Sequence, residues 1–271
     1  MPAFYAHKFF GEQVFTALPA SLKADFALHK EAFLFGTQGP DVLFYYKPFA
    51  KTPVRKKALE IHLSSAKPFF ERCEQKIKEQ ATQLKTAFTK TALAAYVAGF
   101  ICHFQLDNAC HPKVYALEDT GVEHGLIESE FDKYLKLQHG KKVHQNAAKV
   151  LKRKNGVLHS AATALQIEET QALRCFRTMK FINGAFSFPC PAFHKLVKVF
   201  LDKRGAKSFE SMFLHFQNDP ECDKINTGLE QDLQNAIAPT AKLVEEYFLQ
   251  MEKTVENDDF YTQFDKDYEG V

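Results

Sequence analysis

The sequence contains no tryptophan, no Cys-x-x-Cys pair and no long hydrophobic run. Its longest apolar stretch, residues 92–102, has 11 residues, whereas a helix needs about 20 to cross a membrane. The first residues, MPAFYAHKFFGEQ, have no positively charged start, and Glu12 interrupts their apolar positions, so we recognise no signal peptide. We therefore expect a soluble, cytoplasmic protein.

Cysteine pairs of the kind that form disulfide frameworks or zinc ribbons are also missing. The six cysteines lie far apart in the chain: Cys73, Cys102, Cys110, Cys175, Cys190 and Cys222. In a reducing compartment such residues are free thiols, and small apolar thiols are often buried. We therefore expect the six cysteines to be free thiols, several of them buried.

Charge of one sign is not in large excess, because 35 Lys and Arg oppose 33 Asp and Glu for a net charge of +2. So small a charge does not indicate a stable nucleic-acid partner. Basic residues do gather within 51–57 and within 141–154, which we interpret as solvated helix faces; attraction of an anionic substrate or lipid surface is the alternative. The acidic tail after Val255 is expected to be frayed.

Helical periodicity dominates the remaining sequence. Apolar residues recur at spacings of three and four, and no stretch alternates long enough to predict a strand. Gly and Pro separate the segments, with Pro112 among the breaks. We predict one all-α domain over 1–271, with helices near 8–19, 21–35, 54–81, 84–107, 123–138, 168–182, 191–203 and 228–253.

One short stretch, CHFQLDNACHP, carries His103, Asp107 and His111, each four residues after the last. On an α-helix these side chains drift only about 80° around the axis over two turns, so they form one stripe. The stripe follows the apolar run and should be partly buried, where ionisable groups demand partners. Gly99, one turn earlier, is expected to leave room beside it. Two imidazoles and a carboxylate on one face can bind a metal ion.

Further histidines and carboxylates are weaker candidates taken singly. His124 and Glu128 are again four apart, which is also ordinary spacing for a surface pair. Asp41 follows Gly39-Pro40 at the start of a helix, where a carboxylate is favoured in any case. His62 and His7 alone have ordinary explanations. Histidine and carboxylate ligands without thiolates suit zinc, with manganese or iron as alternatives.

Other all-α metal or phosphate chemistries do not fit. The sequence has no His-Asp dipeptide of the HD-type phosphohydrolases and no paired Glu-x-x-His motifs of ferritin-like di-iron proteins. No Gly-rich phosphate loop or Ser/His/Asp triad competes for the chemistry.

Taken in order, these residues resemble the ligand series of the zinc-dependent phospholipase C family, and more distantly that of the P1/S1 nucleases. The segments GPDVLFYYKP, GFICHFQLDNACHP and HGLIESEFDKY are similar to those of the cytosolic bacterial branch of that family. The resemblance is strongest over 1–135. It implies an all-α, phospholipase C/P1 nuclease-like bundle around a cluster of two to three Zn²⁺ ions.

The resemblance also implies how the ligands are shared. One zinc would take Asp41, His62, His103 and Asp107. A second would take His111, His124 and Glu128. A third would share Asp107 and take His7 with the amino terminus of the chain. Asp41 would act as a ligand or as the base that orients the attacking water.

The implied activity is hydrolysis of a phospholipid or related phosphodiester by metal-activated water, with transient contact to a membrane surface. The aromatic residues Phe44, Tyr45 and Tyr46 beside Asp41 are candidates to line the substrate pocket, although aromatic residues more often belong to a core. Two other functions stay open at this point. One is a nuclease or nucleotidase with the same metals, and the other is a non-catalytic, metal-stabilised scaffold.

Overall fold

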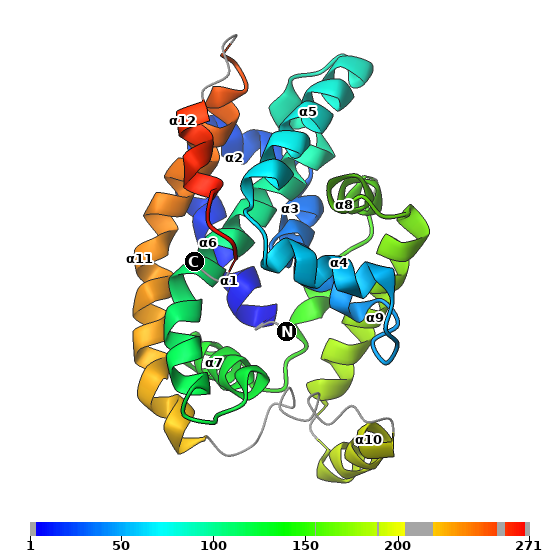
Figure 1. Ribbon diagram of the computed structural model, residues 1–271, viewed down its shortest axis with the longest axis vertical. Helices are drawn as coiled ribbons and strands as arrows, with labels where there is room; N and C mark the ends of the chain where they lie inside the picture. The colour runs from blue at the N-terminus through cyan, green and yellow to red at the C-terminus, as the bar shows by residue number, and fades with distance from the viewer. Residues whose placement is uncertain (1–3, 155, 189, 204–218, 254–257, 269–271) are drawn as a thin grey trace.

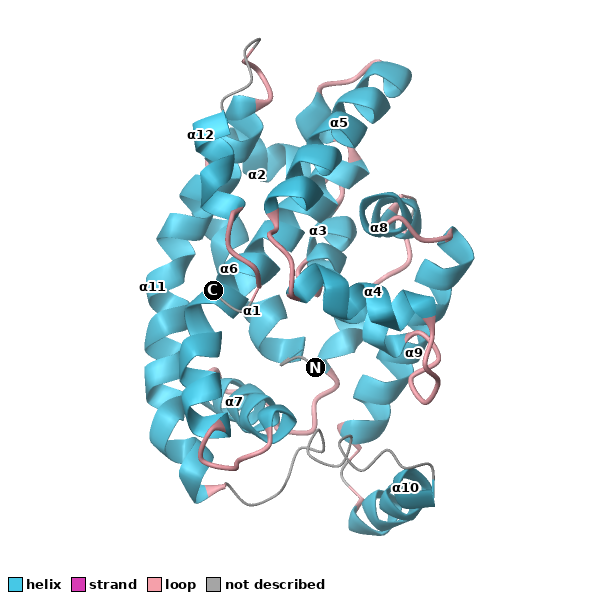
Figure 2. Cartoon of the chain, in the orientation of Figure 1, coloured by secondary structure: helices cyan, strands magenta, loops and turns pink. Residues whose placement is uncertain are grey.

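The computed structural model describes residues 4–154, 156–188, 190–203, 219–253 and 258–268, and within these ranges the chain is helical without strands (Figures 1 and 2). The predicted all-α class is confirmed. The α-helices are α1 (Phe4–Ala17), α2 (Ala20–Ala27), α3 (Lys30–Gly36), α4 (Pro53–His62), α5 (Lys67–Leu84), α6 (Ala92–Glu118), α7 (His124–Gln138), α8 (Val157–Leu165), α9 (Glu169–Phe186), α10 (Pro191–Lys203), α11 (Pro220–Gln250) and α12 (Asp258–Tyr261). Shorter 3-10 helices are η1 (Gly39–Tyr45), η2 (Phe88–Lys90), η3 (Ala147–Val150) and η5 (Thr262–Phe264).

The helix α6 is the centre of the bundle. It is apolar around most of its circumference, which is typical of a helix surrounded by protein. Helices α1, α3, α8 and α11 all pack against it. The helix begins later than predicted, because the Thr91 hydroxyl caps it by accepting a hydrogen bond from the Ala94 N–H (3.1 Å). It also ends later than predicted, because it continues through Pro112 although proline supplies no N–H for the helix ladder.

Two glycines let α3 cross α6 closely. A Cβ on Gly99 would lie 2.1 Å from the Phe33 carbonyl oxygen, and one on Gly36 would lie 2.0 Å from the Tyr96 carbonyl oxygen. The expectation that Gly99 leaves room at the histidine stripe is therefore wrong. Its missing side chain makes space for the backbone of α3.

Two predicted helices are each broken in the structure. The segment 21–35 divides into α2 and α3 near His29, and the segment 54–81 divides into α4 and α5 across residues 63–66. At the second break the C-terminal segment bonds the free backbone groups. Ala66 N–H donates to the Lys266 carbonyl (3.1 Å), and Tyr268 N–H donates to the His62 carbonyl (3.2 Å). These partners are distant in sequence, so local periodicity could not indicate the break.

The C-terminal segment 258–268 is packed, which corrects the expectation of a frayed tail over these residues. Phe260, Tyr261, Phe264 and Tyr268 recur at helical spacing and are all buried. Their aromatic surface outweighs the acidic residues around them, because burial of large rings dominates the energetics of such a segment. Residues 254–257 and 269–271 lie outside the described ranges.

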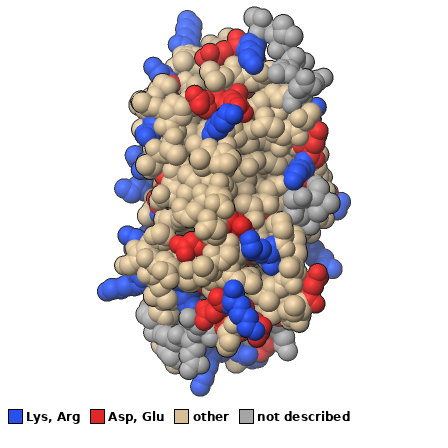
Figure 3. Space-filling model, turned by 90° about the vertical axis from the view of Figure 1, so that its left-hand side faces the viewer, with Lys and Arg blue, Asp and Glu red and all other residues tan. Residues whose placement is uncertain are grey.

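The state of the cysteines and the spread of surface charge both match what the composition predicts. All six cysteines are free, and five of them are buried, as predicted. On the side of the molecule where α11 lies, positive and negative side chains are interspersed over the surface (Figure 3). Within the described part of the chain, none of the helices combines the length and apolar character needed to span a bilayer.

Candidate metal centre

Three elements bring Asp41, His62 and His103 together. Asp41 lies in η1, His62 is the last residue of α4, and His103 lies in the middle of α6. The Asp41 Oδ1 is 3.1 Å from His62 Nε2, and its Oδ2 is 3.8 Å from His103 Nε2. Each of the three offers one ligand atom within 4.8 Å of the others, which is close enough for one ion to bind all of them.

Asp107 connects this group to α1. Its Oδ2 lies 3.0 Å from His103 Nε2, and its Oδ1 lies 3.3 Å from His7 Nε2. The rings of His7 and His103 are stacked with centroids 4.2 Å apart. All three side chains are buried, so the two oxygens of one carboxylate serve two histidines away from water.

A third group forms where α6 meets α7. His124 Nε2 lies 3.2 Å from Glu128 Oε1, and His111 Nε2 lies 4.0 Å from the same oxygen. The predicted spacing of four within each helix thus places His111 and Asp107 on one face of α6, with His124 and Glu128 on the facing side of α7.

Hydrogen bonds at the far side of the rings fix which nitrogen faces the cluster. Three histidines lie with Nδ1 against a main-chain carbonyl: His62 with Ala58 (2.7 Å), His103 with Thr37 (3.3 Å) and His111 with Tyr268 (2.9 Å). A carbonyl oxygen only accepts, so Nδ1 must carry the hydrogen. In the neutral ring Nε2 is then left with its lone pair toward the carboxylates. Metal-binding histidines are held in this way.

The other two candidate ligand histidines, His124 and His7, do not have Nδ1 against a main-chain carbonyl. His124 Nδ1 lies 3.0 Å from Glu118 Oε2, which is a carboxylate in place of a carbonyl. His7 Nδ1 is buried without a hydrogen-bond partner among the described residues. Lone pairs that face carboxylates repel each other unless a cation lies between them, so this donor set fits zinc. The amino terminus that the resemblance implies as a ligand lies outside the described residues.

The charges of the cluster favour a cation as well. Burial would raise the pKa of Asp41, but the neighbouring His103 and His62 hold it at about 2. Burial would lower the pKa of His124, but the Glu128 and Glu118 carboxylates raise it to about 9. Asp41 is therefore ionised at neutral pH, which is the form of a carboxylate that binds a metal ion, whereas His124 releases its proton when it binds one.

A comparison with known protein families identifies the chain. The model of the zinc-dependent phospholipase C family matches residues 6–175, which include all eight residues of the cluster. The chain belongs to the zinc-dependent phospholipase C family. No curated protein and no solved structure matches it. The C-terminal segment, whose Tyr268 bonds His111, lies beyond the part that the family model covers.

The cluster opens into a cavity of about 270 Å³. Six of its lining residues are candidate ligands: Asp41, His62, Asp107, His111, His124 and Glu128. Its other lining residues are Phe44, Leu59, Leu63, Tyr115 and Glu118. The cavity of this phospholipase C-family protein therefore has a charged wall and an apolar wall.

Only one of the three aromatic residues suggested for the substrate pocket lies in this cavity. Phe44 lines it, whereas Tyr45 is buried and its hydroxyl accepts a hydrogen bond from Asn183 (3.3 Å). The Tyr46 ring faces the side chains of Lys47 and Arg174. Tyr45 belongs to the core, and Tyr46 is not among the residues that line the cavity.

Two residues that support the cluster, Asp132 and Gly39, have no role in the sequence-based interpretation. Asp132 of α7 accepts hydrogen bonds from the Tyr5 and Ala6 N–H groups (both 2.8 Å), so it holds the first turn of α1 just before His7. Because residues four apart share one face of a helix, the position of Asp132 four residues after Glu128 could have indicated that it lies beside the cluster. Gly39 has φ +50°, and a Cβ there would lie 2.2 Å from His103 Cδ2.

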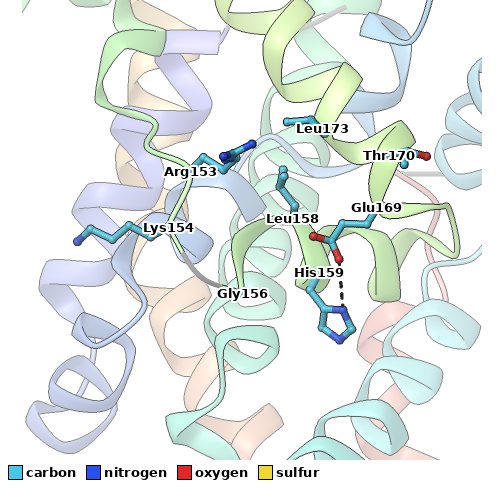
Figure 4. Close-up of a pocket in the computed structure, with 8 residues that line it drawn as sticks. All are labelled: Arg153, Lys154, Gly156, Leu158, His159, Glu169, Thr170 and Leu173. Carbon is cyan, nitrogen blue, oxygen red and sulfur yellow. Dashed lines mark ion pairs between the residues drawn. The ribbon is translucent and has the colours of Figure 1, made fainter.

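A larger hollow lies elsewhere, between α8 and α9 (Figure 4). It measures about 570 Å³ and is lined in part by Arg153, Lys154, His159 and Glu169. Its one histidine pairs with Glu169 at 3.8 Å, and both of these side chains are exposed. None of the three candidate metal-binding groups lies there, so size alone does not locate the chemistry.

Proposed function

We propose that the protein is a phospholipase C-like phosphodiesterase that binds two to three zinc ions and hydrolyses a phospholipid or a related phosphodiester. The observation that carries the proposal is the orientation of His62, His103 and His111. Each has Nδ1 bonded to a main-chain carbonyl and Nε2 toward a carboxylate, which is Asp41, Asp107 or the half-buried Glu128. A group of histidines that only had to be buried would not need this common orientation.

The geometry also limits how the ligands are shared. His103 has Nδ1 at the Thr37 carbonyl, so it has one lone pair for one ion. We assign that lone pair to the ion bound by Asp41 and His62. Asp107 faces His103 with one oxygen and His7 with the other, which suits a bridge between this ion and a third. His111, His124 and Glu128 supply the remaining site.

When bound, clustered zinc ions lower the pKa of water and neutralise charge on the phosphate oxygens. The chain contributes the positioning of the reactants. Asp41 lines the cavity beside the histidines, so its carboxylate serves as a ligand or as the group that orients water for in-line attack. Phe44, Leu59 and Leu63 form the apolar wall against which an acyl glycerol would lie.

A substrate panel tests the proposal. Soluble dihexanoyl phosphatidylcholine, single-stranded DNA and a nucleoside 3′-monophosphate are offered to the zinc-supplemented protein. We expect hydrolysis of the lipid, and we expect Asp41→Asn to lower the rate on the order of 100-fold or more. Asp202→Asn, a change of the same kind at an exposed position of α10, is the control.

Two outcomes contradict the proposed activity. Hydrolysis of DNA or nucleotide alone would favour the nuclease function of the distant relatives. Absence of turnover on every substrate by protein that has bound zinc would favour a metal-stabilised scaffold.

A further inference from the structure

Exposed apolar side chains gather at the mouth of the metal cavity. Leu59 and Leu63, four residues apart at the end of α4, are 52% and 61% exposed, yet both also line the cavity. Phe49, in the loop before α4, is 44% exposed but lines neither hollow, because its ring packs edge-on against Phe200 of α10 with centroids 5.8 Å apart. Single exposed apolar residues need no explanation, but a group around a candidate substrate opening marks an interaction surface.

A second hollow adjoins this opening. It measures about 630 Å³ and shares Phe44 and Leu59 with the metal cavity, so the two hollows meet at these side chains. Its remaining lining residues are Lys51, Thr52, Pro53, Arg55 and Lys56. An apolar path bordered by positive charge thus leads away from the cluster along α4, the helix across the front of the molecule in Figure 1.

The charges around this path are strongly one-sided. Residues 47–63 contain five basic side chains, of which Lys51 and Lys56 border the second hollow, and one acidic side chain, Glu60. Arg55 has a structural task, because its Nη1 donates to the Pro48 and Ala50 carbonyls (2.7 and 3.1 Å) and fixes the loop that presents Phe49. The whole molecule is nearly neutral, so these residues carry a local positive excess, as residues 141–154 also do.

We propose that residues 44–63 dock the protein onto an anionic lipid bilayer, with Leu59 and Leu63 entering the interface and Lys51 and Lys56 contacting lipid phosphates. This inference rests on the proposed function and extends it to a partner. A bilayer satisfies both kinds of side chain, since apolar residues enter the acyl boundary while basic residues attract anionic headgroups. A nucleic acid would neutralise the lysines but leave the leucines in water.

Vesicle flotation of the full, zinc-supplemented chain tests the surface. The vesicles are phosphatidylcholine with phosphatidylserine at 3:1, or phosphatidylcholine alone. We expect tighter binding to the anionic vesicles, weakened by salt. We expect Leu63→Ser and Lys56→Glu each to lower the partition coefficient about three-fold or more. Leu59→Ser gives a second test of the apolar contact, and circular dichroism shows that each variant is folded.

Matched controls lie elsewhere on the molecule. Leu84 ends α5 and is exposed to the same 61% as Leu63. Lys242 of α11 is 74% exposed and pairs with Glu246 four residues on, just as Lys56 is 77% exposed and pairs with Glu60. Leu84→Ser and Lys242→Glu should bind vesicles as the wild type does. Equal losses in the controls, or no vesicle binding by the wild type, would overturn the docking surface.

Monomeric dihexanoyl phosphatidylcholine separates this inference from the proposed function. Hydrolysis of the monomer without vesicle binding would leave the phospholipase activity standing and remove the docking surface. Vesicle binding with the expected pattern, but no hydrolysis of any lipid, would support the surface and remove the proposed activity.

Discussion

Main-chain carbonyls determine what the histidines of this centre can do. The carbonyls of Ala58, Thr37 and Tyr268 each hold one Nδ1–H, and the opposite nitrogens are thereby directed at Asp41, Asp107 and Glu128. Because a histidine that donates at Nδ1 has one remaining lone pair, each ring is committed to one ion. Changes in the supporting backbone should therefore affect metal binding without touching a ligand.

Gly39→Ala tests whether a change in the supporting backbone affects metal binding. Gly39 has φ +50°, and its added methyl would meet the buried His103 ring at 2.2 Å, so the ring must move. We expect a loss of about 1–3 kcal/mol in the free energy of unfolding and fewer bound zinc ions. Gly140→Ala is the control, since Gly140 has φ +64° with nothing within 4 Å of the added atom. Equal effects of the two substitutions, by urea unfolding and zinc content, would show that contact with His103 is unimportant.

Asp132 gives a prediction about pH. Burial raises its pKa to about 6, above the value of an unfolded chain, although the Tyr5 and Ala6 N–H groups oppose this. The folded state therefore holds the proton more firmly, so this residue's contribution to stability falls as pH rises from about 4 to about 6 and is constant above. At about 1.4 kcal/mol per pKa unit, the loss is on the order of 3 kcal/mol.

Asp132→Asn should remove this part of the pH dependence. The measurement is the free energy of unfolding in urea for the zinc-free wild type and variant, from pH 3.5 to 7. The difference between the two proteins is taken at each pH, because the histidines titrate in both and their contribution cancels. We expect the wild type to lose stability relative to the variant across that window. Parallel curves would contradict the assignment of the titration to Asp132.

At the scale of elements, the C-terminal segment closes the metal centre. Its Tyr268 is fully buried, donates its N–H to the His62 carbonyl and accepts at its own carbonyl from His111. The side chain of Asn108 also donates to the Asp267 carbonyl (3.1 Å). One short segment thus holds both the end of α4 and the middle of α6, although it lies outside the matched family region.

Deleting residues 266–271 should loosen the third ligand group. We expect the melting temperature to fall on the order of 10 °C, because a buried aromatic side chain and several hydrogen bonds are lost. Zinc at His111, His124 and Glu128 should also bind more weakly. Deleting residues 270–271 alone keeps Tyr268 and its peptide carbonyl and is the control. If the two truncations have the same melting temperature and zinc content, the segment does not support the centre.

Sequence spacing predicted the parts of the site that lie within one helix. His103, Asp107 and His111 share a face of α6, and His124 and Glu128 share a face of α7, because a spacing of four is local geometry. The approach of His7, Asp41 and His62 depends on tertiary packing, and family resemblance rather than periodicity indicated it. The carbonyl partners of His103 and His111 could not be predicted, because every residue of the chain offers the same main-chain carbonyl.

At the scale of the whole molecule, the candidate metal centre joins five elements of the first half of the chain. The candidate ligands come from α1, η1, α4, α6 and α7, so the cluster lies where these elements converge. The carboxylates of Asp41, Asp107 and Glu128 repel one another unless positive charge lies between them. We therefore expect zinc to stabilise the entire fold, by linkage between binding and unfolding.

The zinc content of untagged protein purified without chelator, determined by elemental mass spectrometry, tests this account most directly. The three ligand groups predict two to three zinc ions per chain, and His103→Ala should lose at least one of them. Removing zinc should lower the melting temperature, and restoring it should reverse the change. Fewer than two zinc ions per chain, even after zinc is supplied, would contradict the metal cluster and the hydrolytic function built on it.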